Sequence, residues 1–326
     1  MVENHHIKFA VAFDGRGGGQ PIVENEGIAE ALKEAKLAWV HLDATHEDTR
    51  EWLHTHVPYL DDIILDALLA DETTPRLIEH GSGYLMFLRG VNLNENASPE
   101  DMVSLRLWID EERIVSLQRR ELRTVTDIQQ RLLENKGPRN SGDFIAILLG
   151  RLLERMAPVW ARLDDMLDDI EQQLIDSPAK SIRARITTSR KQCITLRRYL
   201  TPQREMIMQL RRSELGWMSE LNRRNLQESL DLLTRYIADL DSFKERSLIA
   251  TEELSTHLSA RTDRNMYILS IISLIFLPLG FLTGLLGINV GGIPGADNET
   301  AFWLFLGILT FLVFVQLIVL KFLKWL

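Results

Sequence analysis

Residues 266–289 read MYILSIISLIFLPLGFLTGLLGIN, and the part Met266–Leu286 contains no charged side chain. A second apolar stretch, Ala301–Leu320, follows after a short loop. Each stretch is about 20 residues long, which at a helical rise of about 1.5 Å per residue covers the roughly 30 Å hydrocarbon core of a bilayer. The rest of the chain offers no all-apolar surroundings in which such helices could be buried. The sequence therefore predicts two membrane-spanning helices.

The two predicted spans differ in character. The second is apolar all round and has aromatic residues at its ends, which indicates a lipid-facing helix: Phe302, Trp303 and Trp325. Residues of the first recur at alternating spacings of three and four, which places them on one helix face: Asp263, Met266, Ser270, Ser273, Leu277, Gly280, Gly284 and Gly287. That stripe is small and partly polar. It fits close helix packing through the glycines, and it equally fits the wall of a narrow pore.

Charges around the spans predict their orientation. Basic residues lie just before the first span and just after the second: Arg261, Arg264, Lys321 and Lys324. The loop 287–300 has no Lys or Arg but contains Asp297 and Glu299. By the positive-inside tendency, both termini face the cytoplasm. Two helices cannot enclose a water-filled path by themselves, so a pore would require a homo-oligomeric ring with cyclic symmetry.

The sequence at the end of the first span resembles a known family. The triplet Gly287-Ile288-Asn289, Pro278 within the span and the second span near the C-terminus are similar to the CorA superfamily of two-span GxN cation transporters. The longer string FLTGLLGINVGGIPG at 281–295, with Lys324-Trp325-Leu326, resembles its ZntB zinc-transporter branch. The chain departs from the magnesium branch at Ile288, where those members usually carry Met.

This resemblance implies a fold, an assembly and a function. It implies a CorA-like funnel with a cytosolic α/β domain at 1–140, a helical stalk at 141–265 and a transmembrane domain at 266–326. It also implies a homopentamer in the lipid of the cell inner membrane that transports zinc, with Mg²⁺, Co²⁺, Ni²⁺ and Cd²⁺ as further candidate ions. Coupling to the proton gradient is a further implication, and for this chain it would rest on Asp263, His257 and the loop acids.

The first 140 residues alternate short apolar runs with helical patterns. Five runs have strand character: Ile7–Phe13, Ala38–Asp43, Tyr84–Val91, Met102–Ile109 and Arg113–Gln118. Three segments have helical spacing: Gly27–Lys36, Glu47–His54 and Leu60–Leu69. Short polar turns between the runs at 84–118 favour antiparallel pairing, so we expect a mixed α+β sheet flanked by helices. The glycine run 15–19 lacks the Gly-Lys-Ser/Thr ending of a phosphate loop and predicts a turn.

The segment 141–265 has a helical pattern throughout. A heptad-like course from Leu149 to Leu174 is interrupted only by Pro158, and a second helix is expected at Ala179–Leu200. After Pro202 the next proline is Pro278, which predicts one continuous helix running into the first span. A change in the cytosolic part could then move the first span directly, although a purely structural stalk fits the same pattern.

An acidic cluster lies on the expected helix at 149–174: Asp164, Asp165, Asp168, Asp169 and Glu171. It fits a solvated helix face, and it also fits a collar that attracts cations to a cytosolic entrance, because carboxylate oxygens suit hard divalent ions. In CorA relatives similar acidic arms lie opposite basic residues, and the resemblance implies Lys321 and Lys324 as those partners.

Asn289 is the main candidate for ion selectivity. A ring of Asn amides, with the carbonyls of Gly287 and Ile288, can hydrogen-bond the water around a cation without trapping the ion. The alternative is a helix C-cap, and the resemblance favours the pore. Asp297 and Glu299 would attract cations at the outer mouth, Asp263 would form an inner ring and a second metal contact, and Met266 and Leu277 would be constrictions.

The transported metal is not fixed by the residues. Zinc prefers His nitrogen and Cys sulfur, but 266–326 contain neither, so the residues alone indicate a hydrated hard cation such as magnesium. Only the resemblance indicates zinc. Histidines elsewhere match no closed metal motif, so they are either candidate cytosolic zinc ligands or isolated surface residues: His41, His46, His54, His56, His80 and His257.

Composition narrows the function classes. The charges in 266–326 cancel, so the preceding part carries the whole net charge of −9, which argues against nucleic acid as a partner. The single cysteine excludes an internal disulfide, Met1–Ala10 have no signal-peptide pattern, and no enzyme motif is present. The residues therefore predict a membrane transporter for a divalent cation, and the resemblance implies that this cation is zinc. A magnesium, cobalt or nickel channel of the same superfamily and a membrane-anchored cytosolic sensor or scaffold are the alternatives.

Overall fold

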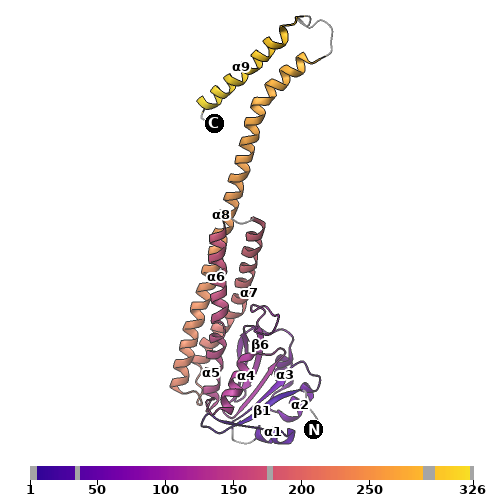
Figure 1. The fold of residues 1–326 in the computed structure, drawn as a ribbon. Helices are drawn as coiled ribbons and strands as arrows, with labels where there is room; N and C mark the ends of the chain where they lie inside the picture. Colours follow the sequence, from indigo (N-terminus) through magenta and orange to yellow (C-terminus); the bar gives the residue numbers. More distant parts are fainter. Residues whose placement is uncertain (1–5, 34–36, 175–178, 289–297, 324–326) are drawn as a thin grey trace. The chain divides into compact units, whose positions relative to one another are not determined.

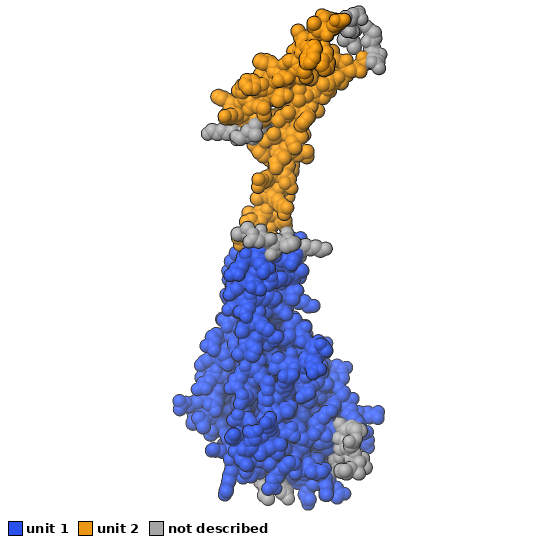
Figure 2. Space-filling view, in the orientation of Figure 1, with its two compact units in different colours: residues 1–251 blue, residues 252–326 orange. Residues whose placement is uncertain are grey.

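The computed structural model describes residues 6–33, 37–174, 179–288 and 298–323. The chain divides into two compact units, Met1–Thr251 and Glu252–Leu326 (Figure 2). The boundary lies within one helix, α8, which spans Glu220–Leu286 (Figure 1). The predicted domain boundaries after residues 140 and 265 remain predictions.

A seven-stranded mixed sheet forms the centre of the first unit, in the order β2-β1-β3-β7-β6-β5-β4. The strands are β1 Ile7–Phe13, β2 Gly19–Pro21, β3 Ala38–Asp43, β4 Arg76–His80, β5 Gly83–Gly90, β6 Val103–Ile109 and β7 Arg113–Gln118. Only the central β3–β7 pair is parallel, and its neighbours are antiparallel. The predicted mixed sheet and its antiparallel pairing at 84–118 are confirmed. Short β2 and β4 were missed, because three- and five-residue edge strands carry little periodicity.

Helices cover both faces of this sheet. They are α1 Asn25–Ala31, α2 Asp48–His56, α3 Asp62–Leu69, α4 Arg123–Leu133 and α5 Ser141–Glu154. On one face Leu53 and Leu65 pack with Val40 and Leu42 of β3 in a common core. On the other face Trp39 meets Phe144 of α5, with ring centroids 4.9 Å apart. Successive β3 residues thus point to opposite layers, as a strand requires.

The glycine run forms the predicted turn. Asp14 accepts hydrogen bonds from the N–H groups of Arg16 and Gly18, at 2.7 and 2.8 Å, and these bonds lower the pKa of its carboxyl group. Gly17 has a φ of 104°, which favours glycine. The run connects β1 to β2 in a hairpin, and β2 begins where a phosphate loop would need a helix.

Long helices follow, with α6 at Ala157–Gln173, α7 at Ala179–Arg212 and α9 at Ala301–Phe322. Pro158 lies in the first turn of α6. Backbone N–H groups in a first turn have no acceptor within the helix, so the N–H that proline lacks is not missed there. Both apolar helices, α8 and α9, have the length and composition to cross a membrane. Helix α8 ends at Leu286, the residue predicted as the end of the first span.

The predicted continuous helix after Pro202 is wrong, because Pro202 lies inside α7 and the break comes at 213–219. A proline inside a helix costs about 3 kcal/mol, but buried residues on both sides of Pro202, such as Leu200 and Met206, outweigh that cost. Arg223 stabilises the turn that follows α7: its Nη1 donates to the carbonyl oxygens of Arg211 and Ser213, at 2.7 and 2.8 Å.

His41 of β3 is a buried titratable group in the sheet, with 1% of its surface exposed. Its Nδ1 lies 2.7 Å from Ser116 Oγ, which also accepts a hydrogen bond from Trp39 Nε1. Burial lowers the pKa of His41 to about 4, and the charge of Lys8 adds to the effect. His41 is therefore a neutral structural residue at physiological pH.

We expect acid to destabilise the first unit through His41. The unfolded chain binds a proton near pH 6.5 and the folded chain only near pH 4, so folding stability falls as pH drops through this window, by at most about 3 kcal/mol. The variant His41→Gln keeps a hydrogen-bonding side chain and should flatten the dependence of urea midpoints on pH between 6.5 and 4, followed by Trp fluorescence. An unchanged pH slope would contradict this role.

Candidate functional site

The predicted small and polar stripe lies on one continuous helix. All its members from Asp263 to Gly284 fall within α8, and the N–H of Gly287 donates to the carbonyl of Thr283 at 2.9 Å as the helix ends. Ile288 follows with 48% of its surface exposed. The helix therefore ends directly before Gly287 and Ile288, the first two residues of the triplet. Asn289, Asp297 and Lys324 lie outside the described residues.

The serines of the stripe present acceptor atoms. Ser270 Oγ donates to the carbonyl of Met266 and Ser273 Oγ to that of Leu269, each at 2.8 Å. Because the hydroxyl hydrogen is used within the helix, the oxygen lone pairs are what each side chain offers to the outside. This arrangement suits the hydration shell of a cation.

The glycines of the stripe do not serve packing within the chain. A Cβ atom built at Gly280 or Gly284 meets nothing within 4 Å among the described residues, α9 included. The close packing that glycines permit is thus not made against the chain's own second apolar helix. In the single chain this glycine face is open.

Pro278 leaves one backbone carbonyl in α8 without its helical hydrogen bond. Proline has no N–H, so the carbonyl of Leu274, four residues earlier, loses its helical donor. Gln316 of α9 supplies one: its Nε2 donates to that carbonyl at 3.2 Å. Gln316 is, with Thr310, one of two uncharged polar residues in α9, and this contact accounts for its amide nitrogen. The sequence analysis missed this pair. The acceptor could have been found, because Leu274 lies four residues before Pro278 and its carbonyl therefore lacks a helical donor.

The outer surface of both helices is apolar and open. Phe281 has 67% of its surface exposed, and the most apolar window of α8 has no buried residue. Phe302, Trp303 and Phe311 of α9 are exposed as well. Such a surface is unstable in water and requires lipid or further copies of the chain.

Three acidic residues of α6 converge on one guanidinium group, that of Arg246 on α8. Arg246 Nη1 lies 3.0 Å from Asp164 Oδ1, and its Nη2 lies 2.5 Å from Asp168 Oδ1. Its Nε lies 2.9 Å from Glu171 Oε1. The bonds to Glu171 and Asp168 raise the pKa of Arg246. The cluster therefore connects α6 to α8.

These basic partners were not predicted. Asp169 is paired with Arg185, at 3.4 Å, whereas Asp165 is exposed. Sequence reasoning missed Arg246 because it lies about 80 positions beyond the acids. Lys321 lies in the last turn of α9, and its pairing with the cluster, like a cation collar, remains a prediction.

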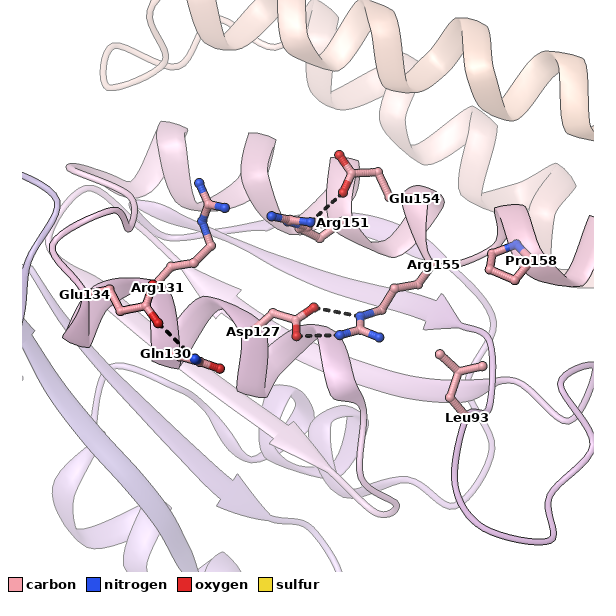
Figure 3. A pocket seen from close by; sticks show the side chains of 9 residues that line it. All are labelled: Leu93, Asp127, Gln130, Arg131, Glu134, Arg151, Glu154, Arg155 and Pro158. Carbon is pink, nitrogen blue, oxygen red and sulfur yellow. Dashed lines mark hydrogen bonds and ion pairs between the residues drawn. The ribbon is translucent and has the colours of Figure 1, made fainter.

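A pocket of about 590 Å³ lies between α4 and the end of α5 (Figure 3). Its lining residues are Leu93, Asp127, Gln130, Arg131, Glu134, Arg151, Glu154, Arg155 and Pro158. Each of its carboxylates already bonds to a lining residue: Asp127 to Arg155, Glu134 to Gln130 and Glu154 to Arg151. The pocket is therefore a poor site for a cation.

Other predicted residues lie apart from one another. Asp263 and Glu299 are exposed, and His257 lies 3.8 Å from Glu253 one turn earlier in α8. His54 is exposed on α2, whereas His80 Nε2 lies 3.4 Å from the carbonyl of Tyr59. Burial raises the pKa of the Cys193 thiol to about 11, so it is a poor zinc ligand at neutral pH.

Comparison with known proteins gives consistent matches over nearly the whole chain. The family model for CorA-like Mg2+ transporter proteins matches residues 34–321. The divalent cation transporter CmaX of Pseudomonas aeruginosa is 39% identical over 299 residues, 91% of this chain and 90% of the relative. The zinc transport protein ZntB of Yersinia enterocolitica is 33% identical over 318 residues, 98% of this chain and 95% of the relative.

Solved structures agree with these matches. The structure of full-length CmaX has a TM-score of 0.84 at 36% identity and covers 99% of both chains. The CorA magnesium transporter of Methanocaldococcus jannaschii has a TM-score of 0.80, covering 96% of this chain and 97% of its own. At 17% identity that second likeness shows the fold alone.

The bond between Gln316 and the Leu274 carbonyl can be tested by a double-mutant cycle. Gln316→Leu leaves that carbonyl without a donor and should destabilise the helix pair by about 1 kcal/mol. Pro278→Ala restores the amide N–H at position 278, so Gln316→Leu in that background should cost clearly less. The measurement is thermal unfolding of the purified protein in detergent. Equal costs in the two backgrounds would show that Gln316 does not serve this carbonyl.

Proposed function

Since this chain belongs to the family of CorA-like Mg2+ transporter proteins, we propose that it is a transporter that passes divalent cations, zinc among them, through a homo-oligomeric pore. The observation that carries the proposal is the pair of exposed apolar helices, the first leading into Gly287-Ile288-Asn289, in a chain similar from end to end to divalent cation and zinc transport proteins. Its relatives are named as transporters, and we propose no catalytic activity.

In this proposal the ion passes along the stripe of α8. The amide of Asn289 and the carbonyls of Gly287 and Ile288 hold a hydrated cation at the outer end. Ser270 and Ser273 offer acceptor oxygens further in, and Met266 and Leu277 form the constrictions. Exposed Asp263 concentrates cations at the inner end, and Asp297 with Glu299 does the same at the outer mouth. The face of Gly280 and Gly284 then borders neighbouring copies or the path itself.

Two ions compete as the physiological substrate. The similarity to zinc transport proteins over 98% of the chain supports zinc. The ligand set between Met266 and Leu326 is all oxygen, which supports magnesium or cobalt as the second candidate. Passage of zinc with most of its water retained reconciles the two, because an oxygen-lined path need not replace the ion's inner shell.

The membrane arrangement is part of the same proposal. Basic residues at Arg261 and Arg264 and at the end of α9 support cytoplasmic termini in the inner membrane. A ring of five copies follows from the family resemblance. The remaining rival is a membrane-anchored sensor, in which α8 and α9 only tether the α/β domain. A tether tolerates changes along the stripe, whereas a pore does not.

Flux through liposomes distinguishes a pore from a tether. We expect Asn289→Ala and Ser273→Leu to reduce zinc flux at least about tenfold, equivalent to about 1.4 kcal/mol in the barrier to ion passage, while the proteins still assemble. The matched control is Thr310→Val in α9, because Thr310 also bonds its own helix, at 2.8 Å, but lies off the stripe. Separate reporters for zinc and magnesium rank the ions. No flux of either ion through assembled wild-type protein would indicate the tether, whereas wild-type flux in both stripe variants would place the ion path away from the stripe.

We further propose that zinc movement is coupled to protons through Asp263 and His257. One pH unit stores about 1.4 kcal/mol per proton, so a coupled transporter should change its zinc accumulation ratio up to about tenfold per proton and pH unit. The measurement is zinc accumulation in liposomes with and without a pH gradient at clamped membrane potential, in wild type and in Asp263→Asn. Equal accumulation in wild type under both conditions would exclude coupling.

A further inference from the structure

A cluster of two imidazoles and a carboxylate lies at one end of the sheet in the first unit. His6 immediately precedes β1, His46 lies in the turn between β3 and α2, and Asp48 is the first residue of α2. The backbone fixes this meeting, because the N–H of Asp43 donates to the carbonyl of His6 at 2.8 Å. The start of β1 is thereby held against the turn that carries the other two residues.

The side chains of this cluster converge. One possible ligand atom from each of His6, His46 and Asp48 lies within 4.8 Å of the others. The two imidazole centroids are 5.8 Å apart, and His46 Nδ1 lies 3.5 Å from Asp48 Oδ2. Three ligand atoms that bind one ion tetrahedrally at about 2.0–2.1 Å lie about 3.3 Å apart. The three side chains therefore need to move only a little closer together to bind an ion. Asp48 can make it, since 62% of its side chain is exposed.

His6 gives an independent indication that the cluster binds a ligand. Only 7% of its surface is exposed, and its Nε2 has no hydrogen-bond partner in the described part of the chain. A buried polar nitrogen of this kind is uncommon unless something satisfies it. Burial lowers the pKa of His6, and the neighbouring His46 adds to the effect against the opposing charge of Asp48. A neutral imidazole is the form that binds a metal ion.

We propose that His6, His46 and Asp48 form a binding site for a zinc-like transition-metal ion on the α/β domain, distinct from the transport path. Two nitrogens and one carboxylate oxygen are the donor set of zinc and its neighbours, whereas magnesium prefers oxygen alone. Three protein ligands leave one tetrahedral position for water. Binding itself does not depend on the proposed transport function, because all three residues belong to the first unit.

His56 is not one of the ligands. Its ring stacks on Trp52 with centroids 5.0 Å apart, and its Nδ1 lies 3.0 Å from the Trp52 carbonyl. Trp52 also lies beside His6, at 6.1 Å between ring centroids. The indole and His56 thus form a wall next to the site, and the fluorescence of Trp52 should respond to an ion bound there.

The test uses the full-length protein in detergent, without a polyhistidine tag, in the Asn289→Ala background. Excess magnesium occupies hard-cation sites, and zinc binding is then measured by equilibrium dialysis. Cobalt serves as a second probe through its visible d–d absorption. The variants are His46→Gln and Asp48→Asn, because both side chains are partly exposed and their loss should not unfold the domain. His54→Gln, on the exposed side of α2, is the matched control.

We expect one zinc ion per chain to be lost, or its dissociation constant to rise at least about tenfold, in His46→Gln and Asp48→Asn but not in His54→Gln, since even outer partners of metal ligands are worth about that factor. The tetrahedral cobalt absorption should disappear with it. Unchanged zinc binding in both variants, or an equal loss in the control, would overturn the site. Because the readout is binding and not flux, a failed transport assay leaves this result unaffected.

Discussion

The two apolar helices, α8 and α9, determine which surroundings this chain requires, because their exposed side chains are unfavourable in water. The most apolar windows of α8 and α9 bury almost nothing within the chain, so their stability has to come from lipid and from other copies. In a bilayer the same helices must satisfy every backbone polar group themselves, because no water is present to do so. A polar residue in either helix is therefore expensive unless a partner or a function accounts for it.

This requirement divides the polar residues of the two helices into those with a partner on the other helix and those whose partner lies in their own helix. Gln316 is accounted for by the carbonyl that Pro278 leaves without a donor, so its polarity serves structure. Ser270 and Ser273 satisfy their hydrogens within α8, but their oxygens face outward from a face that α9 does not cover. A Cβ atom built at Gly280 or Gly284 on the same face would meet no described atom beyond the neighbouring backbone of its own helix. The stripe is thus the part of the helix pair whose composition the single chain does not explain.

The features that the sequence predicted correctly are those that interactions between neighbouring residues determine. Three of the predicted strands, including Ala38–Asp43, match the structure at both ends, because apolar alternation and flanking turns are encoded within a few residues. The position of Pro202 inside α7 could not be predicted, since distant packing outweighed a strong local signal. Arg246 and His6 were missed for a related reason: each becomes meaningful only beside residues that lie 40 to 80 positions away. The stripe was predictable because one helix carries all of it.

Side chains with oxygen ligands and side chains with imidazole ligands lie in different parts of the chain, which separates the proposed transport path from the proposed binding site. Between Met266 and Leu326 the side chains offer oxygen and no nitrogen or sulfur of the kind zinc prefers, so the proposed transport path would hold a zinc ion weakly. Weak binding is what passage requires, because an ion that binds tightly does not leave. Imidazoles occur only in the preceding part, and two of them meet a carboxylate at His6, His46 and Asp48. The two proposals thus assign tight, selective binding to a place where the ion need not move, and loose, hydrated contact to the path along which it moves.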